Sequence, residues 1–270
     1  MERQIISSRQ NALVKQVCAL CDKKGREKQG LFRFDGSKLL EEALSSDAKI
    51  EYVFCSQNIS ERAKSAVERA LCAGRVAEDR VISVTESVFE KMSEESAPEG
   101  VITVACFMDS LHSRVGEDIP KRILIAESLR DPGNLGTVMR SAYALGMDAL
   151  ILTDDCANVY NPKTLRAAMG AAFKLPTRTV PFGELEHLIA ELRAQGRAVY
   201  ATALREDSRD LRDIELREGD CFVIGNEGHG LTESAVAACT APVIIPMREG
   251  AESLNAAAAA AICIWETVRV

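Results

Sequence analysis

The sequence predicts two α/β domains, the second of them built on a mostly parallel sheet. The chain has 270 residues, and at roughly 100–200 residues per domain this length favours two domains. Its composition, 47% hydrophobic and 27% charged, is that of a globular protein with a real core. In the second half, apolar runs of strand length alternate with helical stretches or loops, which is typical of parallel strands covered by helices. These runs lie at 123–127, 149–153, 198–203, 221–225 and 243–247.

The first half contains the elements of a smaller α/β unit. Between residues 11 and 24 the apolar side chains recur at spacings of three and four, which predicts a one-sided helix with a basic opposite face. Alternating and helical patterns then predict, in chain order, a strand at 31–34, a turn at Asp35-Gly36, a helix at 38–44, a strand at 50–55, a helix near 60–73 and strands near 81–84 and 101–107. We therefore expect a first domain over residues 1–107.

The segment from Asp109 to Arg122 mixes charges with a glycine and a proline and has no periodicity, which predicts a linker over 108–120. The second domain is then expected over 121–270. No run of 18 or more uncharged apolar residues occurs, so a membrane span is excluded. The first residues form no apolar stretch with a cleavage site, and we expect a cytoplasmic protein.

The nine cysteines and three histidines do not predict a metal site. The cysteines are scattered and mostly lie in apolar segments, where a thiol packs as a small hydrophobic group, so we expect them to be reduced. Cys18 and Cys21 have the C-x-x-C spacing, but no second pair and no histidine lies near them in the sequence. We therefore expect no metal ion.

The net charge of −7 argues against a protein that simply coats nucleic acid. Residues 1–33 nevertheless hold eight Lys or Arg against three acids, so positive charge is concentrated at one end of the chain. A basic helix face there is compatible with RNA binding, and a solvated helix face is the alternative.

A first cluster of interest, Asp131-Pro-Gly-Asn-Leu-Gly-Thr-Val-Met-Arg140, follows the strand predicted at 123–127 and opens a helix that runs to about Leu145. Ligands of open α/β sheets bind at such carboxyl ends of strands. The two glycines are not spaced as in the dinucleotide fingerprint, which counts against an oxidoreductase. Arg140 offers a fork that could hold a phosphate or a developing negative charge, although a lone arginine more often forms a surface salt bridge.

A second cluster, Phe222-Val-Ile-Gly-Asn-Glu-Gly-His-Gly-Leu-Thr-Glu233, is a buried strand that breaks into a glycine-rich loop before a helix. Three glycines within six positions expose backbone N–H and C=O groups, which suits recognition of a flat polar ligand by the main chain. A purely structural turn is the alternative. His229 has no acid at triad spacing, and a catalytic role for it is disfavoured.

A third cluster runs from the strand Val243-Ile-Ile-Pro-Met247 through a polar loop to Glu252-Ser-Leu-Asn255, where an alanine-rich helix begins. Glu252 or Ser253 is the expected N-cap of a helix over Ala256–Glu266. The alanines by themselves need no ligand. Three strand-to-helix junctions of this kind in one domain, however, favour one composite site over three separate turns.

Together the three clusters resemble the signature motifs of the SpoU or TrmH group of SPOUT methyltransferases. The resemblance rests on Asn134 and Arg140, on the strand ending in Gly225-Asn-Glu-Gly-His-Gly230, and on Ile245-Pro-Met247 followed by Ser253-Leu-Asn255. Arg166-Ala-Ala-Met-Gly170 followed by Phe173-Lys-Leu-Pro176 is similar to the mid-domain stretch of the family. Residues 1–107, especially Ser7 to Lys15 and Phe32-Arg-Phe-Asp-Gly36, resemble the L30e-like substrate-binding domain of the group.

The resemblance implies a ribose 2′-O-methyltransferase that uses S-adenosyl-L-methionine, acts on RNA, forms a homodimer through its C-terminal domain and carries a trefoil knot there. It implies catalytic roles for Arg140, Asn134, Glu227, Ser253 and Asn255. The cofactor-binding residues that it implies are Ile224, Gly225, Asn226, Gly228, Gly230, Leu231, Ile245, Met247, Ser253, Leu254 and Ala256. The expected RNA-binding residues are Arg9, Asn11, Lys15, Lys23, Lys24 and Arg26.

Several alternatives stay open. Ribosomal RNA is the favoured substrate because an L30e-like domain accompanies the catalytic one, with transfer RNA as the alternative. A non-catalytic RNA-binding protein on the same scaffold would be expected to lack Arg140 or the glycines of the second cluster, and this chain keeps both. Arg140 could act as a base or as an electrostatic stabiliser of the incipient alkoxide; because a guanidinium is effectively always protonated, the second role costs less.

Overall fold

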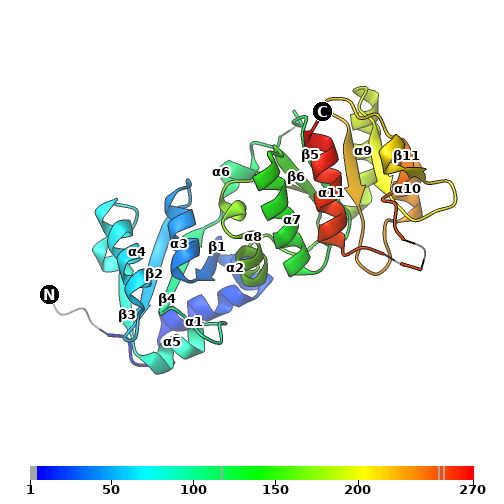
Figure 1. The fold of residues 1–270 in the computed structure, drawn as a ribbon. Helices are drawn as coiled ribbons and strands as arrows, with labels where there is room; N and C mark the ends of the chain where they lie inside the picture. Colours follow the sequence, from blue (N-terminus) through cyan, green and yellow to red (C-terminus); the bar gives the residue numbers. More distant parts are fainter. Residues whose placement is uncertain (1–4, 117, 249, 252) are drawn as a thin grey trace. The chain divides into compact units, whose positions relative to one another are not determined.

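A computed structural model describes residues 5–116, 118–248, 250–251 and 253–270 of the chain. Contacts divide the chain into two compact units (Figure 1). The first comprises residues up to Asp109 together with Tyr160–Phe173, and the second comprises Ser110–Val159 with Lys174–Val270. The units differ from the predicted domains in two places. Tyr160–Phe173 groups with the first unit rather than with residues 121–270, and the predicted linker 108–120 is divided between the units after Asp109 and contains the short helix α6 (Asp109–His112).

The first unit contains a four-stranded sheet in the order β1-β4-β2-β3. β4 (Val101–Cys106) runs antiparallel to both β1 (Leu31–Asp35) and β2 (Ile50–Ser56), and β3 (Val81–Val84) is parallel to β2. The helices of this unit are α1 (Ala12–Cys18), α2 (Lys23–Gln29), α3 (Ser37–Leu44), α4 (Glu61–Cys72), α5 (Glu86–Met92) and α8 (Pro162–Ala168). The predicted strands are present, as are the helices predicted at 38–44 and near 60–73, whereas α5 and α8 were not predicted.

The single helix predicted over 11–24 is interrupted. α1 ends at Cys18, a 3₁₀ turn covers Ala19–Cys21, and Asp22 is extended before α2 begins. The carbonyls released at this break accept hydrogen bonds from the Arg26 guanidinium, Leu20 O at 3.0 Å and Cys21 O at 2.7 Å. Arg26 is therefore buried, because it supplies the donors that the broken helix lacks.

Aromatic side chains explain why residues 160–173 belong to the first unit. Phe32 of β1 stacks on Tyr160 with ring centroids 4.5 Å apart, and Phe34 lies 5.2 Å from Phe173. Phe32, Phe34 and Phe173 are each exposed by 2% or less. Aromatic pairs of this kind contribute about 0.5–1.5 kcal/mol beyond the burial of their surface. The segment thus completes the core of the first unit.

The second unit is built on a seven-stranded sheet in which every described pairing is parallel, in the order β7-β6-β5-β10-β8-β11-β9. The strands are β5 (Ile123–Ala126), β6 (Ala149–Thr153), β7 (Thr177–Val180), β8 (Val199–Thr202), β9 (Arg209–Asp210), β10 (Cys221–Ile224) and β11 (Ala241–Ile244). The predicted α/β class and mostly parallel sheet are confirmed. β7 and β9 were not predicted, because edge strands lack the continuous apolar run of buried ones.

The helices of the second unit are α6 (Asp109–His112), α7 (Pro132–Leu145), α9 (Leu185–Ala194), α10 (Glu233–Ala238) and α11 (Ala256–Val268). α7 and α11 lie side by side and pack against one another (Figure 1). Asn255 caps α11 by accepting from the N–H groups of Ala257 and Ala258. The expected cap at Ser253 is therefore wrong, and Glu252 lies outside the described residues.

Strand order and pairing do not by themselves define a knot, so the trefoil knot stays a prediction. In the part of the chain that the structure describes, no helix combines the length and apolar character needed to cross a bilayer.

Candidate active site

A cavity of about 500 Å³ opens at the carboxyl ends of β10, β8 and β11, which are neighbours in the sheet. The carboxyl edge of a parallel sheet is where α/β proteins bind their ligands. The lining residues come from four segments, of which the first three begin at the ends of the strands. They are 202–205 from the end of β8, 224–231 with Glu233 and Val236 from the end of β10, 243–245 with Met247 from the end of β11, and Ser253, Leu254, Ala256 and Ala259 around the start of α11.

All the residues expected to bind a cofactor line this cavity. They are Ile224, Gly225, Asn226, Gly228, Gly230, Leu231, Ile245, Met247, Ser253, Leu254 and Ala256. Of the residues expected to be catalytic, Glu227 and Ser253 line it, whereas Asn134, Arg140 and Asn255 do not. The second and third sequence clusters therefore meet at one cavity. The first cluster is connected to these two clusters by hydrogen bonds.

The glycine-rich loop between β10 and α10 folds back on itself. Asn226 and Gly230 exchange two backbone hydrogen bonds of 3.0 Å, and Gly230 has a φ of +70°, which favours glycine. A Cβ on Gly225 would lie 2.3 Å from the carbonyl carbon of Gly230. Only a residue without a side chain allows the loop to close this tightly, so Gly225 is required by packing within the loop.

The Asn226 side chain holds the interior of the loop. Its Oδ1 accepts from the N–H groups of Gly228, at 2.9 Å, and His229, at 3.2 Å, and its Nδ2 donates to the Ser128 carbonyl at 2.8 Å. Asn226 thereby ties the loop after β10 to the residues that follow β5.

Glu227 connects the loop to the first cluster. Its Oε1 accepts from the Asp131 N–H at 3.0 Å and from Asn134 Nδ2 at 3.1 Å, and its Oε2 accepts from the Arg130 N–H at 3.3 Å. Burial raises the pKa of Glu227, but hydrogen bonds from Asn134 and from backbone N–H groups outweigh burial and hold the pKa below its ordinary value. Glu227 is thus a carboxylate at neutral pH, which suits an acceptor and makes it a weak general base.

Asn134 links Glu227 to the third cluster. While its Nδ2 donates to Glu227, its Oδ1 accepts from Asn255 Nδ2 at 3.0 Å. Asn255 is in turn the N-cap of α11. A continuous chain of side chains, Glu227–Asn134–Asn255, therefore joins the three clusters, as the composite-site hypothesis required.

Arg140 is separate from this chain. It is exposed, and in the described part of the structure no hydrogen bond or ion pair of its side chain is found. It lies six residues beyond Asn134 on α7, and at about 100° per residue it points roughly 120° away from Asn134 around the helix. Arg140 therefore lies on another side of α7 than Asn134, and neither residue lines the cavity.

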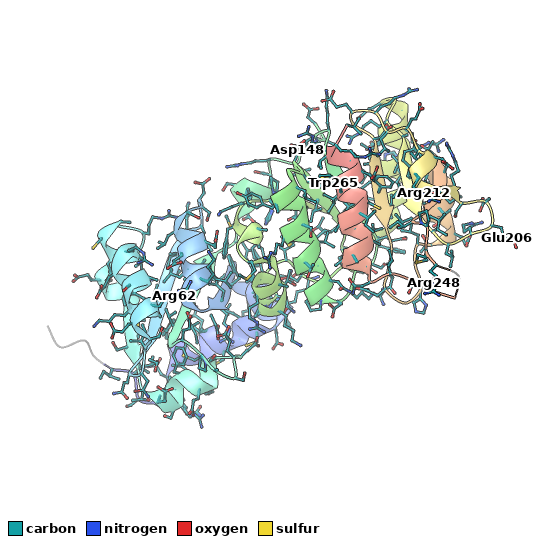
Figure 2. All side chains as sticks on the ribbon, in the orientation of Figure 1. Arg62, Asp148, Glu206, Arg212, Arg248 and Trp265 are labelled. Carbon is teal, nitrogen blue, oxygen red and sulfur yellow. The ribbon has the colours of Figure 1, made fainter. Side chains whose placement is uncertain are left out.

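The loop 202–205 was missed by the sequence reading. The apolar run at 198–203 predicted its strand, but only the sheet order reveals that β8 lies between β10 and β11. The loop after β8 consequently lines the same cavity, and Arg205 pairs there with Glu233 of α10 at 2.5 Å. Figure 2 labels Glu206, the residue after this segment, and Arg248 in the loop after β11, neither of which lines the cavity. The rule that ligands bind at the carboxyl ends of strands could have indicated residues 202–205.

Family models match both units of the chain. The SpoU rRNA methylase family matches residues 121–265, and the MRM3-like substrate binding domain matches residues 11–103. The chain belongs to the SpoU rRNA methylase family.

Relatives of this SpoU methylase chain extend over nearly its whole length. The 23S rRNA (guanosine(2553)-2′-O)-methyltransferase RlmP of Bacillus subtilis is 33% identical over 96% of this chain and 97% of its own. The AdoMet-bound rRNA methyltransferase from Sinorhizobium meliloti is 28% identical, with a TM-score of 0.82, over 98% of this chain and 97% of its own. The AviRb methyltransferase of Streptomyces viridochromogenes in complex with AdoMet is 28% identical with a TM-score of 0.80, over 96% of this chain and 98% of its own.

The residues expected to bind RNA in this SpoU family chain differ in their exposure and in their hydrogen bonds. Lys15, Lys23 and Lys24 are exposed, and Arg9 is exposed while its Nε donates to the Ser87 carbonyl at 2.9 Å. Asn11 caps α1 through its side chain. Arg26 is 2% exposed and is bound to the carbonyls at the helix break, so the prediction that it contacts RNA is wrong.

No ligand set for a metal ion is found among the described residues of this SpoU methylase, where no three His, Cys, Asp or Glu side chains come close enough together. None of the nine cysteines forms a disulfide. Burial raises the pKa of the Cys21 thiol to about 11, so this half of the C-x-x-C pair is a thiol rather than a thiolate at neutral pH.

Proposed function

We propose that the chain is an S-adenosylmethionine-dependent methyltransferase that methylates a ribose 2′-hydroxyl of ribosomal RNA. The observation that carries this proposal is the chain of hydrogen-bonded side chains Glu227–Asn134–Asn255, which joins three distant segments beside the cavity. The names of the relatives, rRNA 2′-O-methyltransferases and AdoMet-bound rRNA methyltransferases, point to the same reaction.

The cavity fits such a cofactor. Its volume of about 500 Å³ lies within the roughly 300–1,000 Å³ typical of small-molecule sites. Apolar residues such as Ile224, Val243 and Leu254 suit a flat base, and the Glu227 carboxylate suits a positively charged group. When bound, S-adenosylmethionine supplies an electrophilic methyl group on a sulfonium, so no metal is needed for the transfer.

The residues of the chain then have separate tasks. The main chain of 225–231 and of Ile245, Met247, Ser253, Leu254 and Ala256 is assigned to cofactor binding, since these residues line the cavity. Glu227, held as a carboxylate, fixes Asn134 and through it Asn255. Arg140 is assigned to the ribose oxygen, where a permanent guanidinium charge would stabilise the incipient alkoxide or hold the adjacent phosphate.

The position of Arg140 supports a homodimer through the second unit. Arg140 does not line the cavity of its own chain, and the adjoining α7–α11 surface exposes apolar side chains: Tyr143 is 46% exposed, Ile262 37% and Trp265 56%. Figure 2 shows Trp265 on α11. Exposed apolar patches of this kind mark interaction sites. We expect light scattering to give a dimer mass for the wild type and a monomer mass for Trp265→Glu; a wild-type monomer would contradict the homodimer.

The first unit is proposed to hold the RNA. Lys15, Lys23 and Lys24 give α1 and α2 an exposed basic face, which suits recognition of folded RNA through its phosphates. The proposed location is the cytoplasm, and nine cysteines without a disulfide are compatible with a reducing compartment.

The decisive experiment maps ribose methylation across total RNA from cells with and without the gene. One ribosomal position that loses its methyl group on deletion, and regains it with wild-type but not with Arg140→Ala protein, is the expected result. A change confined to transfer RNA would contradict the ribosomal substrate. Unchanged methylation throughout, together with RNA binding by the purified protein, would support a non-catalytic RNA-binding protein instead.

A further inference from the structure

Glu127 is a buried carboxylate directly after β5, with 2% of the residue exposed. Both of its oxygens accept from one residue: Oε2 from the Thr232 N–H at 2.8 Å and Oε1 from the Thr232 hydroxyl at 2.6 Å. Burying a carboxylate is costly unless its oxygens are hydrogen-bonded. The two bonds therefore fix Thr232 firmly to the end of β5.

Thr232 is the residue at which the glycine-rich loop 225–231 enters α10. Its hydroxyl also accepts from the Ala235 N–H at 3.2 Å and so caps that helix. The contact with Glu127 consequently determines where the loop ends.

Ser128, the residue after Glu127, holds the other end of the same loop. Its carbonyl accepts from Asn226 Nδ2 at 2.8 Å. Ser128 has a φ of +54°, which is uncommon for a residue other than glycine, and two contacts maintain it: its N–H donates to Thr153 Oγ1 at 2.8 Å and its hydroxyl to Asp155 Oδ2 at 2.5 Å. Two consecutive residues thus hold the loop at its beginning and at its end.

Neither Glu127, Ser128 nor Thr232 lines the cavity, whereas the loop between the two attachment points does. We propose that Glu127, together with Ser128, is a positioning residue that sets the main chain of 225–231 in its cofactor-binding conformation. The inference rests on the proposed function. Because the loop binds through backbone groups that have no side-chain freedom, a small displacement of its ends removes several contacts at once.

Glu127→Gln tests the proposal, because the variant keeps the size of the side chain and replaces one acceptor oxygen by a donor. Isothermal titration with S-adenosylhomocysteine, which has no methyl group to transfer, should show a dissociation constant about tenfold higher than that of the wild type. Thr232→Ser keeps the hydroxyl and should bind as the wild type does, whereas Thr232→Val should bind as weakly as Glu127→Gln. The double variant should lose less than the product of the two single losses.

Arg193→Ala is the matched control, because the Arg193 guanidinium donates to the Ala238 carbonyl, at 2.7 Å, at the far end of α10. The Arg193→Ala substitution removes a hydrogen bond of the same helix without contacting the loop 225–231. The affinity of this variant for S-adenosylhomocysteine should therefore equal that of the wild type. Wild-type affinity in both Glu127→Gln and Thr232→Val, or an equal loss in Arg193→Ala, would overturn the positioning role alone. If the wild type itself binds neither S-adenosylmethionine nor S-adenosylhomocysteine, the proposed function is overturned and this inference with it.

Discussion

The side-chain amide of Asn134 donates to Glu227 Oε1 across 3.1 Å, although the two residues lie 93 positions apart in the chain. The same amide accepts from Asn255 on its other side. One planar group with a fixed donor and a fixed acceptor end thus sets the distance between the loop after β10 and the start of α11. Each amide end faces a partner of the matching kind, so substitutions at this position have a predictable sign.

Asn134→Asp should lower the rate of methyl transfer more than Asn134→Ala does. The aspartate retains the acceptor for Asn255 but places a second carboxylate against Glu227, and like charges at this distance repel. We expect a loss of about tenfold or more for the alanine variant and a larger one for the aspartate. Single-turnover transfer of labelled methyl groups to RNA measures both.

Thr137→Ala is the control for Asn134, because Thr137 lies on the same helix and its hydroxyl donates to the Gly133 carbonyl within that helix. Its rate should match the wild type. Equal rates for the aspartate and alanine variants would contradict the expected repulsion between Glu227 and a carboxylate at position 134.

The pH dependence of stability should depend on Glu227. Its folded-state pKa is depressed, so the stability that it contributes is present above its unfolded pKa, about 4.3, and is lost as the pH falls through the folded value. The melting temperature of the wild type should therefore exceed that of Glu227→Gln at neutral pH, and the difference should shrink below about pH 4.

Scanning calorimetry of both proteins across the acidic range measures the difference in melting temperature. Glu206→Gln removes a negative charge from an exposed loop position and controls for the change in net charge (Figure 2). A melting difference that is the same at neutral pH and at low pH would contradict the assigned role of the Glu227 carboxylate.

Gly225→Ala should destabilise the second unit and weaken cofactor binding together. The added Cβ would lie 2.3 Å from Gly230 C and 2.4 Å from the Leu231 nitrogen, and backbone atoms cannot move aside cheaply. Overpacking of this kind costs about 1–3 kcal/mol. Gly183→Ala, where the Cβ would meet nothing within 4 Å, should change the free energy of unfolding by less than about 0.5 kcal/mol. Denaturant titration compares the two, and an unaffected Gly225→Ala would refute the close approach.

Replacing Lys23 and Lys24 by glutamate should weaken RNA binding and reduce its salt dependence. Each phosphate contact that is lost lowers the slope of log affinity against log salt by about 0.9. Filter binding at several salt concentrations measures the slope. Arg62→Glu with Lys64→Glu changes a pair of exposed cations on α4 and is the charge-matched control. RNA binding by this variant should depend on salt more steeply than RNA binding by the variant with Lys23 and Lys24 replaced. Equal slopes for the two pairs would remove α2 from the RNA-binding surface.

The sequence by itself determined the local elements and the chemistry at their ends. Apolar runs predicted the buried strands at 123–126, 149–153 and 221–224 closely, because a strand covered on both faces must be apolar throughout. Asn134, Glu227 and Asn255 were selected because their motifs resemble those of the SpoU or TrmH group, and they lie at strand-to-helix junctions, where ligands of α/β sheets bind.

Only the tertiary structure decided which junctions meet and which side chains are buried. The placement of β8 between β10 and β11 brings the loop 202–205 to the cavity, and strand order depends on contacts between segments far apart in the chain. Arg26 belongs to a basic stretch in the sequence, yet the break after α1 turns it inward because released carbonyls need donors. Periodicity describes one element at a time, whereas burial and hydrogen-bond partners are properties of elements packed together.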